Sequence, residues 1–286
     1  MTEKEKKKLP RTVTEVIIRV LFFITMPAAF SSGFLGVKHI CSSVGAGTPI
    51  QLDRIWVLIG LVAFTIIFGR FFCGFVCAFG SFGDFVYYIS GLIQTKLLGQ
   101  KKQITIPEKT TVILQKLKYL ILLAIAVLCA LGIYSKISGW SPWDVFSRFM
   151  VFKPPGLDYL AGIILFTLII YGMAFKKIFF CQFLCPLGAL FALLPVLPFS
   201  GIHRNEENCI KGCKACKMNC PVNVKLGEDI LRNGECISCE KCMGICPKSN
   251  LSRPERKLIR NDIILLVIKA VLFFAMGAFL GLCRFF

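Results

Sequence analysis

Two runs of cysteine near the end of the sequence have the spacing of iron-sulfur ligands. The later run, which ends with Cys246 and a proline, follows the C-x2-C-x2-C-x3-C-P pattern of bacterial ferredoxins. In that pattern three thiolates bind one cluster and the fourth binds a sister cluster. The earlier run ends with Cys220 and a proline, and it has one extra residue between Cys209 and Cys213. A short loop can absorb that residue, so the two runs predict two [4Fe-4S] clusters.

The crossover rule assigns each cysteine of the two runs to a cluster. It predicts that the first cluster binds Cys209, Cys213, Cys216 and Cys246. It predicts that the second binds Cys236, Cys239, Cys242 and Cys220. Paired zinc ribbons also use C-x2-C units, but two C-x3-C-P endings fit a ferredoxin better than a common zinc spacing. Disulfides are less favoured, because the cytosolic placement argued below keeps thiols reduced.

A second cysteine spacing occurs twice upstream of these runs. Residues 70–80 and 178–188 align without gaps, and each contains a C-x3-C pair. The four cysteines are Cys73, Cys77, Cys181 and Cys185. Side chains four residues apart lie on one face of a helix, so two parallel copies could bring four thiols together. Four thiolates are the ligand set of an iron-sulfur cluster, and the repeat therefore predicts a third centre. Zinc, a redox dithiol and simple packing of buried cysteine are the alternatives.

The elements that must position these motifs are strongly apolar. With 56% hydrophobic residues and a mean hydropathy of +0.70, the 286-residue sequence is typical of an integral membrane protein. Five stretches are long enough to cross roughly 30 Å of hydrocarbon. They cover residues 17–37, 55–77, 117–137, 159–181 and 262–283. We expect an all-α membrane protein of about five transmembrane helices, the first four forming a pseudo-two-fold repeat about an axis along the membrane normal.

Three domains follow from this pattern. They are a transmembrane repeat domain at 1–200, a two-cluster ferredoxin-like domain at 201–254, and a C-terminal transmembrane helix at 255–286. Basic residues, Lys116 and Lys118 among them, gather before the first span and between the second and third, which places those segments in the cytosol. Counting spans then places the ferredoxin domain in the cytosol, on a multi-pass protein of the inner (cytoplasmic) cell membrane. A cleaved signal peptide is the less favoured alternative for the first span.

The charge and the histidines limit the possible partners. The net charge of +18 mostly reflects the basic cytosolic segments, and it also suits an acidic redox protein. Nucleic acid is disfavoured, because the basic residues flank spans instead of forming an aromatic-lined groove. His39 and His203 fall on opposite sides of the membrane, which excludes a bis-histidine haem.

Three further features have a favoured structural interpretation. Cys129, in the middle of the third span, is expected to pack. Lys269, near one end of the last span, is expected to snorkel to the cytosolic surface, and a functional intramembrane charge is the weaker alternative. Residues 139–148 are expected to form an interfacial aromatic belt, with part of a quinone headgroup pocket as the weaker alternative.

The paired C-x3-C motifs followed by a two-cluster segment resemble the NapH/NosR-type membrane polyferredoxins. The resemblance runs from the first span to Pro247 and implies a membrane electron-transfer subunit, often a quinol dehydrogenase that feeds a reductase or a maturation system. Ala78 stands where that family often has proline. No flavin-binding domain precedes the spans as in the NosR branch, so covalent flavin is not expected.

Two functions compete on this basis. In the first, the protein transfers electrons between the membrane quinone pool and a redox partner, as a quinol dehydrogenase-like subunit of a larger redox system whose partner is an acidic redox protein or a reductase subunit. In the second, it is a regulatory, sensing or maturation protein whose clusters carry no sustained electron flow. Quinone-dependent oxidation or reduction of the clusters would separate the two.

Overall fold

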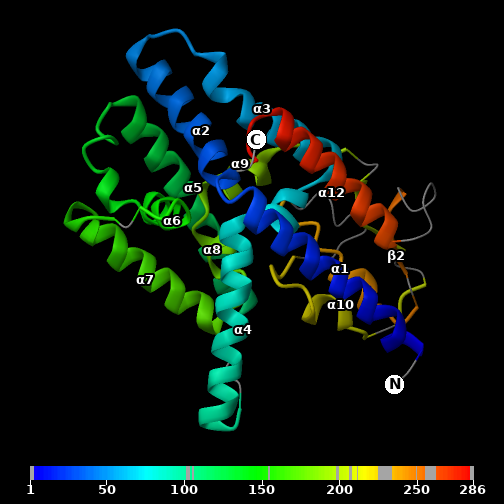
Figure 1. Cartoon of the computed structure of the whole chain (residues 1–286). Helices are drawn as coiled ribbons and strands as arrows, with labels where there is room; N and C mark the ends of the chain where they lie inside the picture. Colours follow the sequence, from blue (N-terminus) through cyan, green and yellow to red (C-terminus); the bar gives the residue numbers. More distant parts are fainter. Residues whose placement is uncertain are drawn as a thin grey trace.

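The computed structural model of the chain describes residues 3–100, 104, 106–153, 155–197, 200–205, 208–210, 212–224, 234–248, 250–254 and 262–283. These residues form helices and one two-stranded sheet. Figure 1 shows the long helices fanning out from a centre where two short helices lie. These are α8 (Phe179–Phe183) and α9 (Pro186–Leu193). The centre contains the second C-x3-C motif, so the helices meet where the predicted chemistry is.

The first repeat copy begins with three long helices. They are α1 (Glu3–Thr25), α2 (Ala29–Ala46) and α3 (Leu52–Phe68). The predicted first span is broken between α1 and α2, which meet at an angle of 59°. Pro27 lies in the break, and proline ends helices because it lacks an N–H and its ring clashes with the preceding turn. α2 then packs against α3, and a Cβ added at Gly36 would lie 2.9 Å from Leu58 Cβ.

The second half forms a separate set of helices around α5 (Glu108–Ala130). The other elements are η2 (Ser138–Trp140), α6 (Pro142–Met150), η3 (Leu157–Tyr159) and α7 (Leu160–Phe175). α6 begins where the Ser141 hydroxyl accepts a hydrogen bond from Asp144 N, and Pro142 occupies its first turn. The two halves meet where α2 crosses α5, because a Cβ at Gly45 would lie 2.0 Å from Ala130 O. No residue larger than glycine fits this contact.

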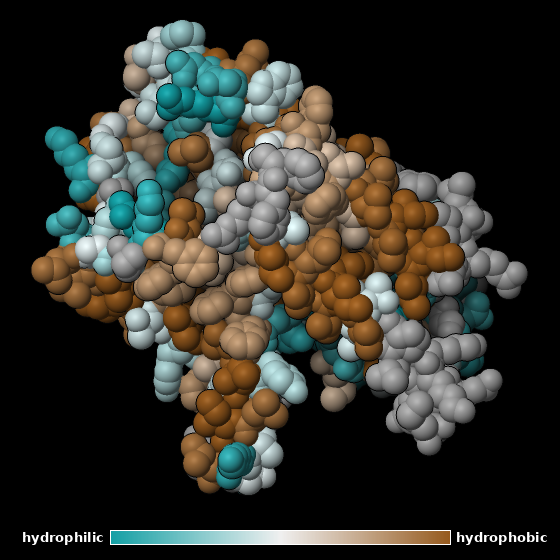
Figure 2. Space-filling model, viewed as in Figure 1, coloured by the Kyte–Doolittle hydropathy of each residue, from teal (hydrophilic) through white to brown (hydrophobic). Residues whose placement is uncertain are grey.

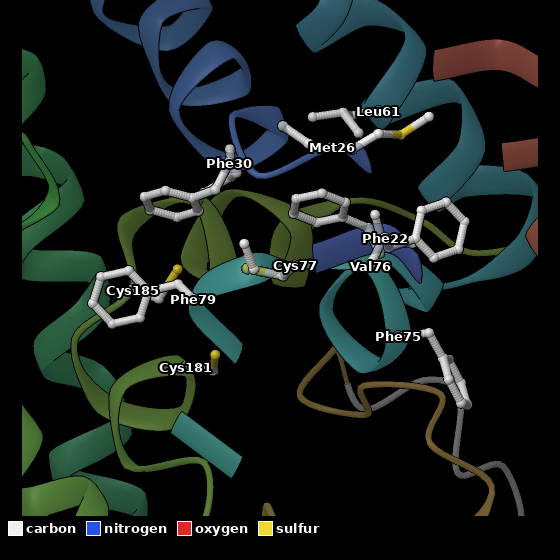
Figure 3. Close-up of a cluster of buried hydrophobic side chains, with 14 of the residues drawn as sticks. Phe22, Met26, Phe30, Leu61, Phe75, Val76, Cys77, Phe79, Cys181 and Cys185 are labelled. Carbon is white, nitrogen blue, oxygen red and sulfur yellow. The ribbon is translucent and has the colours of Figure 1, made fainter. Parts of the chain in front are cut away.

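A phenylalanine-rich core joins the halves and the last helix, α12 (Asp262–Phe279). Phe273 of α12 packs edge-on against Phe22 of α1 and Phe64 of α3, with centroid separations of 5.6 and 4.9 Å. Phe79 stacks on Phe180 at 3.8 Å, so the residues beside the two C-x3-C motifs are in direct contact. Figure 3 shows this core around Phe22, Phe79 and the cysteines. Each such aromatic pair contributes about 0.5–1.5 kcal/mol beyond area burial.

The helices that carry the C-x3-C motifs are interrupted at matching places. α3 ends at Gly69, whose φ of 71° is open to glycine, and a one-turn π-helix, η1 (Phe72–Val76), follows before α4 (Ala78–Leu98). α7 ends before Ile178, whose φ is 58°, and α8 follows. The predicted spans at 55–77 and 159–181 are therefore too long at their C-terminal ends. Hydropathy does not detect these breaks, because the residues on both sides are apolar.

The number of long apolar helices is smaller than the five predicted. Within the described residues, three are long and apolar enough to cross a membrane: Lys109–Ala130, Leu157–Phe175 and Asp262–Phe279. The bent pair α1 and α2 makes a fourth if it counts as one span. α3 is 17 residues long, because Gly69 ends it. Figure 2 shows hydrophobic residues over α12 and along much of α4 on one face of the molecule.

The cysteine-rich segment is not a separate domain in the described part of the chain. It contains α10 (Ala215–Met218), α11 (Lys241–Ile245), and strands β1 (His203–Arg204) and β2 (Leu251–Ser252). The strands pair antiparallel, with His203 opposite Ser252, and bring the two ends of the segment together. The segment packs directly on the helices, since a Cβ at Gly234 would lie 2.0 Å from Ala192 O of α9. No separate ferredoxin-like domain is resolved within the described residues, and the predicted domain boundaries stay predictions. The expectation of an all-α chain is corrected by the short two-stranded ladder.

Two smaller predictions can also be assessed. Cys129 is 4% exposed and packs with Phe34 and Ile125, which confirms the packing prediction. Lys269 is 1% exposed, and its Nζ lies 6.0 Å from the centre of the Phe68 ring. The snorkelling prediction is wrong, because the ammonium is enclosed between α12 and the end of α3. Counting the predicted spans also places the C-terminus, residues 284–286, outside the cell, and these residues lie outside the described part of the chain.

Candidate functional site

The two C-x3-C motifs have the same local backbone. Cys77 N donates to Phe72 O at 2.8 Å, and Cys185 N donates to Phe180 O at 3.0 Å. These residues occupy equivalent positions in the repeat, and both bonds span five residues. In each copy the first cysteine lies in a short helical turn and the second is the N-cap of the next helix. The pairs were expected on one face of one helix, and instead each pair crosses a helix break.

The two motifs converge on a common space. Figure 3 shows the sulfurs of Cys77, Cys181 and Cys185 arranged around it. A Cβ added at Gly80 would lie 3.7 Å from Cys77 Cβ and 3.8 Å from Cys181 Sγ, and 3.4 Å from the carbonyl oxygen of Cys73. Cys77, Cys181 and Cys185 are all less than 9% exposed. Because both copies contribute, this space lies at the contact between the two halves of the chain.

A buried arginine faces this space. Arg70 is 2% exposed, and its Nη2 lies 3.9 Å from Cys73 Sγ. A Cβ at Gly188 would be 3.1 Å from the same Nη2 and 3.4 Å from Cys185 Sγ, so the guanidinium lies between cysteines of the two copies. Nη1 donates to Gly234 O at 2.9 Å, while Nε is buried without a hydrogen-bond partner. A buried cation needs an anionic counterpart, and thiolates or a cluster that carries negative charge would supply it.

Helix ends add to the positive potential. Cys77 and Cys185 are the N-caps of α4 and α9, where the backbone N–H groups of the first turn are exposed to the sulfur. Gly188 N donates to Cys185 Sγ at 3.2 Å. Helix N-termini and nearby arginine both stabilise thiolate over thiol. The chemistry of this donor set therefore fits a thiolate-bound metal centre.

A second buried charge lies beside Arg70. Lys118 of α5 is fully buried, and its Nζ donates to a carboxylate oxygen of Glu235. Tyr119 Oη donates to the other oxygen of the same carboxylate at 2.9 Å. Lys118 was expected in a basic cytosolic loop, and that assignment is wrong because its charge is paired inside the protein. The pair fixes the residue that directly precedes Cys236.

The four cysteines predicted for the second cluster line one small cavity. They are Cys220, Cys236, Cys239 and Cys242. Apolar residues, Ile202 and Val224 among them, complete the wall. Burial raises the pKa of the Cys239 thiol to about 11 and that of Cys242 to about 12. These thiols hold their protons at neutral pH, so metal binding here must release protons.

The cysteines predicted for the first cluster lie at the outer side of the same segment. Cys216 on α10 and Cys246 after α11 pack against the core that Cys239 belongs to. Arg204 Nη2 lies 3.4 Å from Cys209 Sγ, and Asn250 N donates to Cys246 Sγ at 3.3 Å. Cys213 N donates to Ile210 O at 3.1 Å and closes the turn before α10. Both ligand assignments stay predictions.

The C-x3-C site and the cysteine-rich segment touch each other. Cys73, Cys181 and Cys239 line a common cavity. A Cβ at Gly74 would lie 2.7 Å from Ile237 O, so the π-helix reaches the backbone between Cys236 and Cys239. Glycine is required for this approach, because a Cβ that close to a backbone atom forces the chain to move. The predicted third centre is thus directly adjacent to the predicted second cluster.

The cysteine spacing does not suit a single ion. Within the described residues, no three His, Cys, Asp or Glu side chains are close enough together to hold one metal ion. A four-iron cluster has a different requirement, because each cysteine binds its own iron and the sulfurs stand further apart.

Three functional residues were not identified from the sequence. Arg70 precedes the first C-x3-C motif, and its repeat counterpart is Ile178. The departure from the repeat was the available signal. Lys118 lies inside an apolar stretch, and an intramembrane charge is by itself a sign of function. The sequence gives no sign that Gly74 is required, because the residue that it contacts, Ile237, is 163 positions away.

Comparison with known proteins agrees with the position of these motifs. The sequence matches the 4Fe-4S binding domain family over residues 54–102 and 157–198, which contain the two C-x3-C motifs. The uncharacterized protein MJ0750 of Methanocaldococcus jannaschii is 31% identical over 87% of this chain and 96% of its own length. MJ0749 of the same organism is 30% identical over 82% of this chain and 84% of its own.

A more distant relative carries a functional name. YccM of Escherichia coli strain K12, named for electron transport, is 28% identical over 76% of this chain and 59% of its own length. No solved structure matches the chain.

Proposed function

Because this chain belongs to the 4Fe-4S binding domain family, we propose that it is a membrane-bound iron-sulfur protein that transfers electrons through three centres. The first centre is held by Cys73, Cys77, Cys181 and Cys185. The other two are held by the ferredoxin-type runs in the crossover arrangement given above. When bound, such clusters accept and release single electrons. The relative YccM, with its electron transport name, supports the same class of activity.

The observation that carries this proposal is the shared cavity of Cys73, Cys181 and Cys239. A regulatory cluster could lie anywhere in the fold, whereas a conduit needs its centres next to one another. Gly74 keeps the π-helix against Ile237, and Arg70 ties the first motif to Gly234. Cysteines of the C-x3-C motifs and of the later ferredoxin-type run thus line the same cavity. Phe79 and Phe180, beside the two motifs, stack on each other and are fully buried.

The helices support placement in the membrane, with the cysteine-rich segment facing the cytosol. Three or four of them meet the requirement of length and apolarity. We propose that α3 is a further span, since its 17 residues reach the lower limit of length for a transmembrane helix. Basic residues that flank the spans favour the cytosolic side for the cysteine-rich segment. In this arrangement the C-x3-C centre lies at the cytosolic boundary of the membrane.

A groove between α5, α6 and α7 supports a quinone as the lipid-soluble electron carrier. Its volume is about 350 Å³, and its lining is almost entirely apolar. Its wall includes Ile121, Trp140 and Trp143. It also includes Leu184, the residue next to Cys185. An apolar groove of this volume, bordered by aromatic side chains, suits the ring of a lipid-soluble carrier.

The test is the iron content of anaerobically purified protein. Three [4Fe-4S] clusters require about twelve iron atoms per chain. Cys73→Ser and Cys181→Ser should each remove about four and leave the ferredoxin-type signals in the electron paramagnetic resonance spectrum. Cys129→Ser is the matched control, because Cys129 is buried in α5 among Phe34 and Ile125 and should change nothing. Unchanged iron in both test variants would show that the C-x3-C cysteines only pack.

A second measurement separates electron transfer from regulation. A quinol analogue should reduce the clusters of the wild-type protein within repeated turnovers when an electron acceptor is present. Cys73→Ser should block this reduction while dithionite still reduces the remaining clusters. Clusters that the quinol analogue never reduces, in protein with full iron content, would favour a regulatory or maturation role.

A further inference from the structure

A lysine-lined groove lies beside the cysteine-rich segment, and it shares Lys241 and Cys220 with the thiol cavities described above. It has a volume of about 390 Å³ and lies between the end of α7, the side of α4 and the turn after α10. Three lysines from two distant segments line it: Lys176, Lys177 and Lys241. Tyr87, Phe175 and Cys220 form other parts of the wall. The volume is within the range of small-molecule sites.

The positive charge of this groove is only partly balanced. Asp84 lies 3.9 Å from Lys177, but the same carboxylate accepts a hydrogen bond from Arg19. Burial lowers the pKa of Lys177 to about 8, an effect that Asp84 opposes and the neighbouring Lys241 charge reinforces. Asp84 and Arg19 offset each other, so the three lysines remain as excess positive charge. Folding has brought like charges together at a cost that a bound anion would relieve.

We propose that this groove binds a phosphate group. Lysine ammonium groups are point charges that bind phosphate oxygens through strong charge-assisted hydrogen bonds. Two lysines directly after α7 and a third at the start of α11 converge on one cavity, which a single flexible surface lysine would not do. The binding itself does not depend on the electron-transfer function. Phosphate binding would be linked to electron transfer through Cys220 in the groove wall only if Cys220 binds a cluster as proposed above.

Two sources of the phosphate group fit the residues that line the groove. One is the headgroup of an anionic phospholipid, because Lys176 and Lys177 follow a helix long and apolar enough to span the membrane. The other is a soluble phosphate-bearing redox compound, whose ring would lie near Tyr87 and Phe175. The first would anchor the cysteine-rich segment at the lipid surface. The second would place an electron donor or acceptor beside Cys220.

The experiment uses the full-length protein with its clusters, in nanodiscs of phosphatidylcholine and chloride buffer. Inorganic phosphate is titrated by calorimetry. The wild-type protein should bind it, and Lys176→Gln with Lys177→Gln should weaken binding about tenfold or more, since each lost charged hydrogen bond costs more than a neutral one. Lys109→Gln with Lys116→Gln is the control, because these lysines are exposed on α5. This control should bind phosphate as the wild type does.

Three further arms separate the possible explanations of the result. Lys176→Arg with Lys177→Arg retains the charge and should retain binding, which separates loss of charge from loss of fold. Cys73→Ser should bind phosphate normally, so failure of the cluster proposal and failure of this one are distinguishable. Nanodiscs with added phosphatidylglycerol should abolish phosphate binding if a lipid headgroup is the natural ligand, and leave it intact if a soluble compound is. Equal phosphate binding by the wild type and the glutamine variant, or none by the wild type in phosphatidylcholine, would overturn the proposal.

Discussion

The ion pair between Lys118 and Glu235 provides a quantitative test of how the cysteine-rich segment is held. Lys118 is 0% exposed, and the side chain of Glu235 is 16% exposed. Replacing Lys118 by Met leaves a carboxylate largely out of water without its cation, a change that typically costs about 3–5 kcal/mol. Tyr119 Oη still donates to Glu235, and the Arg70 charge acts on the same carboxylate. We therefore expect a cost near the lower limit, about 3 kcal/mol.

A double-mutant cycle isolates this interaction. Glu235→Gln in the Lys118→Met background removes the carboxylate that has lost its lysine, so the double variant should be more stable than Lys118→Met alone. The coupling free energy should be about 2 kcal/mol, within the range for residues in one buried network. Lys116→Met is the matched control, because Lys116 is exposed on the same helix and should change stability by at most about 0.5 kcal/mol.

The assay is reversible unfolding in mixed micelles of mild detergent and dodecyl sulfate, with helix content as the signal. The electron paramagnetic resonance signal of the cluster assigned to Cys236 provides a second readout, because Glu235 directly precedes that cysteine. It should broaden in Lys118→Met, and recover in part in the double variant. Purely additive single-variant costs would refute the reasoning, since they would mean that the two charges do not stabilise each other.

Two other substitutions test the neighbouring contacts. Gly74→Ala should lower the free energy of unfolding by about 1–3 kcal/mol and weaken the magnetic interaction between adjacent clusters, because the new Cβ lies 2.7 Å from Ile237 O. Gly244→Ala is the control. A Cβ at Gly244 has no atom within 4 Å, so this variant should change neither unfolding nor spectra. Arg70→Gln should lower the reduction potential of the centre at Cys73 by about 60 mV or more, because loss of a nearby positive charge disfavours the added electron. For one electron, about 59 mV corresponds to about 1.4 kcal/mol. A redox titration that shows no shift, at full iron content, would mean that Arg70 has only a structural role.

The sequence predicts the internal repeat because the motif is short and contiguous. Residues 70–80 and 178–188 can be aligned by eye, and their hydrogen bonds from Cys77 and Cys185 are equivalent in the structure. The grouping of Cys220 with the later run is likewise accessible, because ferredoxin spacing encodes a known crossover. The structure places Cys220, Cys236, Cys239 and Cys242 around one cavity, while their binding of a cluster stays a prediction. Local patterns thus identify the candidate site, since chemistry is carried by residues close in sequence.

The breaks in the helices could not be predicted in the same way. Hydropathy averages over about twenty residues, and it does not register one residue with positive φ such as Gly69 or Ile178. It also misses the length of α4, which runs on to Leu98 until Gly99 ends it with a φ of 69°. α4 extends for 21 residues in the structure. Backbone conformation at single positions decides these boundaries.

Long-range charges tie the cysteine-rich segment to the helices of the chain. Glu240 lies between two predicted cluster ligands with a φ of 57°, a conformation that costs a residue with a side chain about 1–3 kcal/mol. Its carboxylate accepts a bond from Arg11 Nη2 of α1 at 2.8 Å and from Arg253 Nη1 at 3.0 Å. Two charge-assisted bonds of about 1.5–3 kcal/mol each offset that strain.

Arg11 continues this network to the last helix, because its Nη1 lies 3.6 Å from Asp262 at the start of α12. The loop of the second ferredoxin-type run is therefore tied to both the first and the last long helix of the chain. A segment this short, with a core of few apolar residues, has little hydrophobic burial of its own. Its position is instead set by buried charges on helices that are far away in the sequence. An electron-transfer site benefits from this arrangement, because the distance between its centres then depends on the rigid helical body and not on a flexible linker.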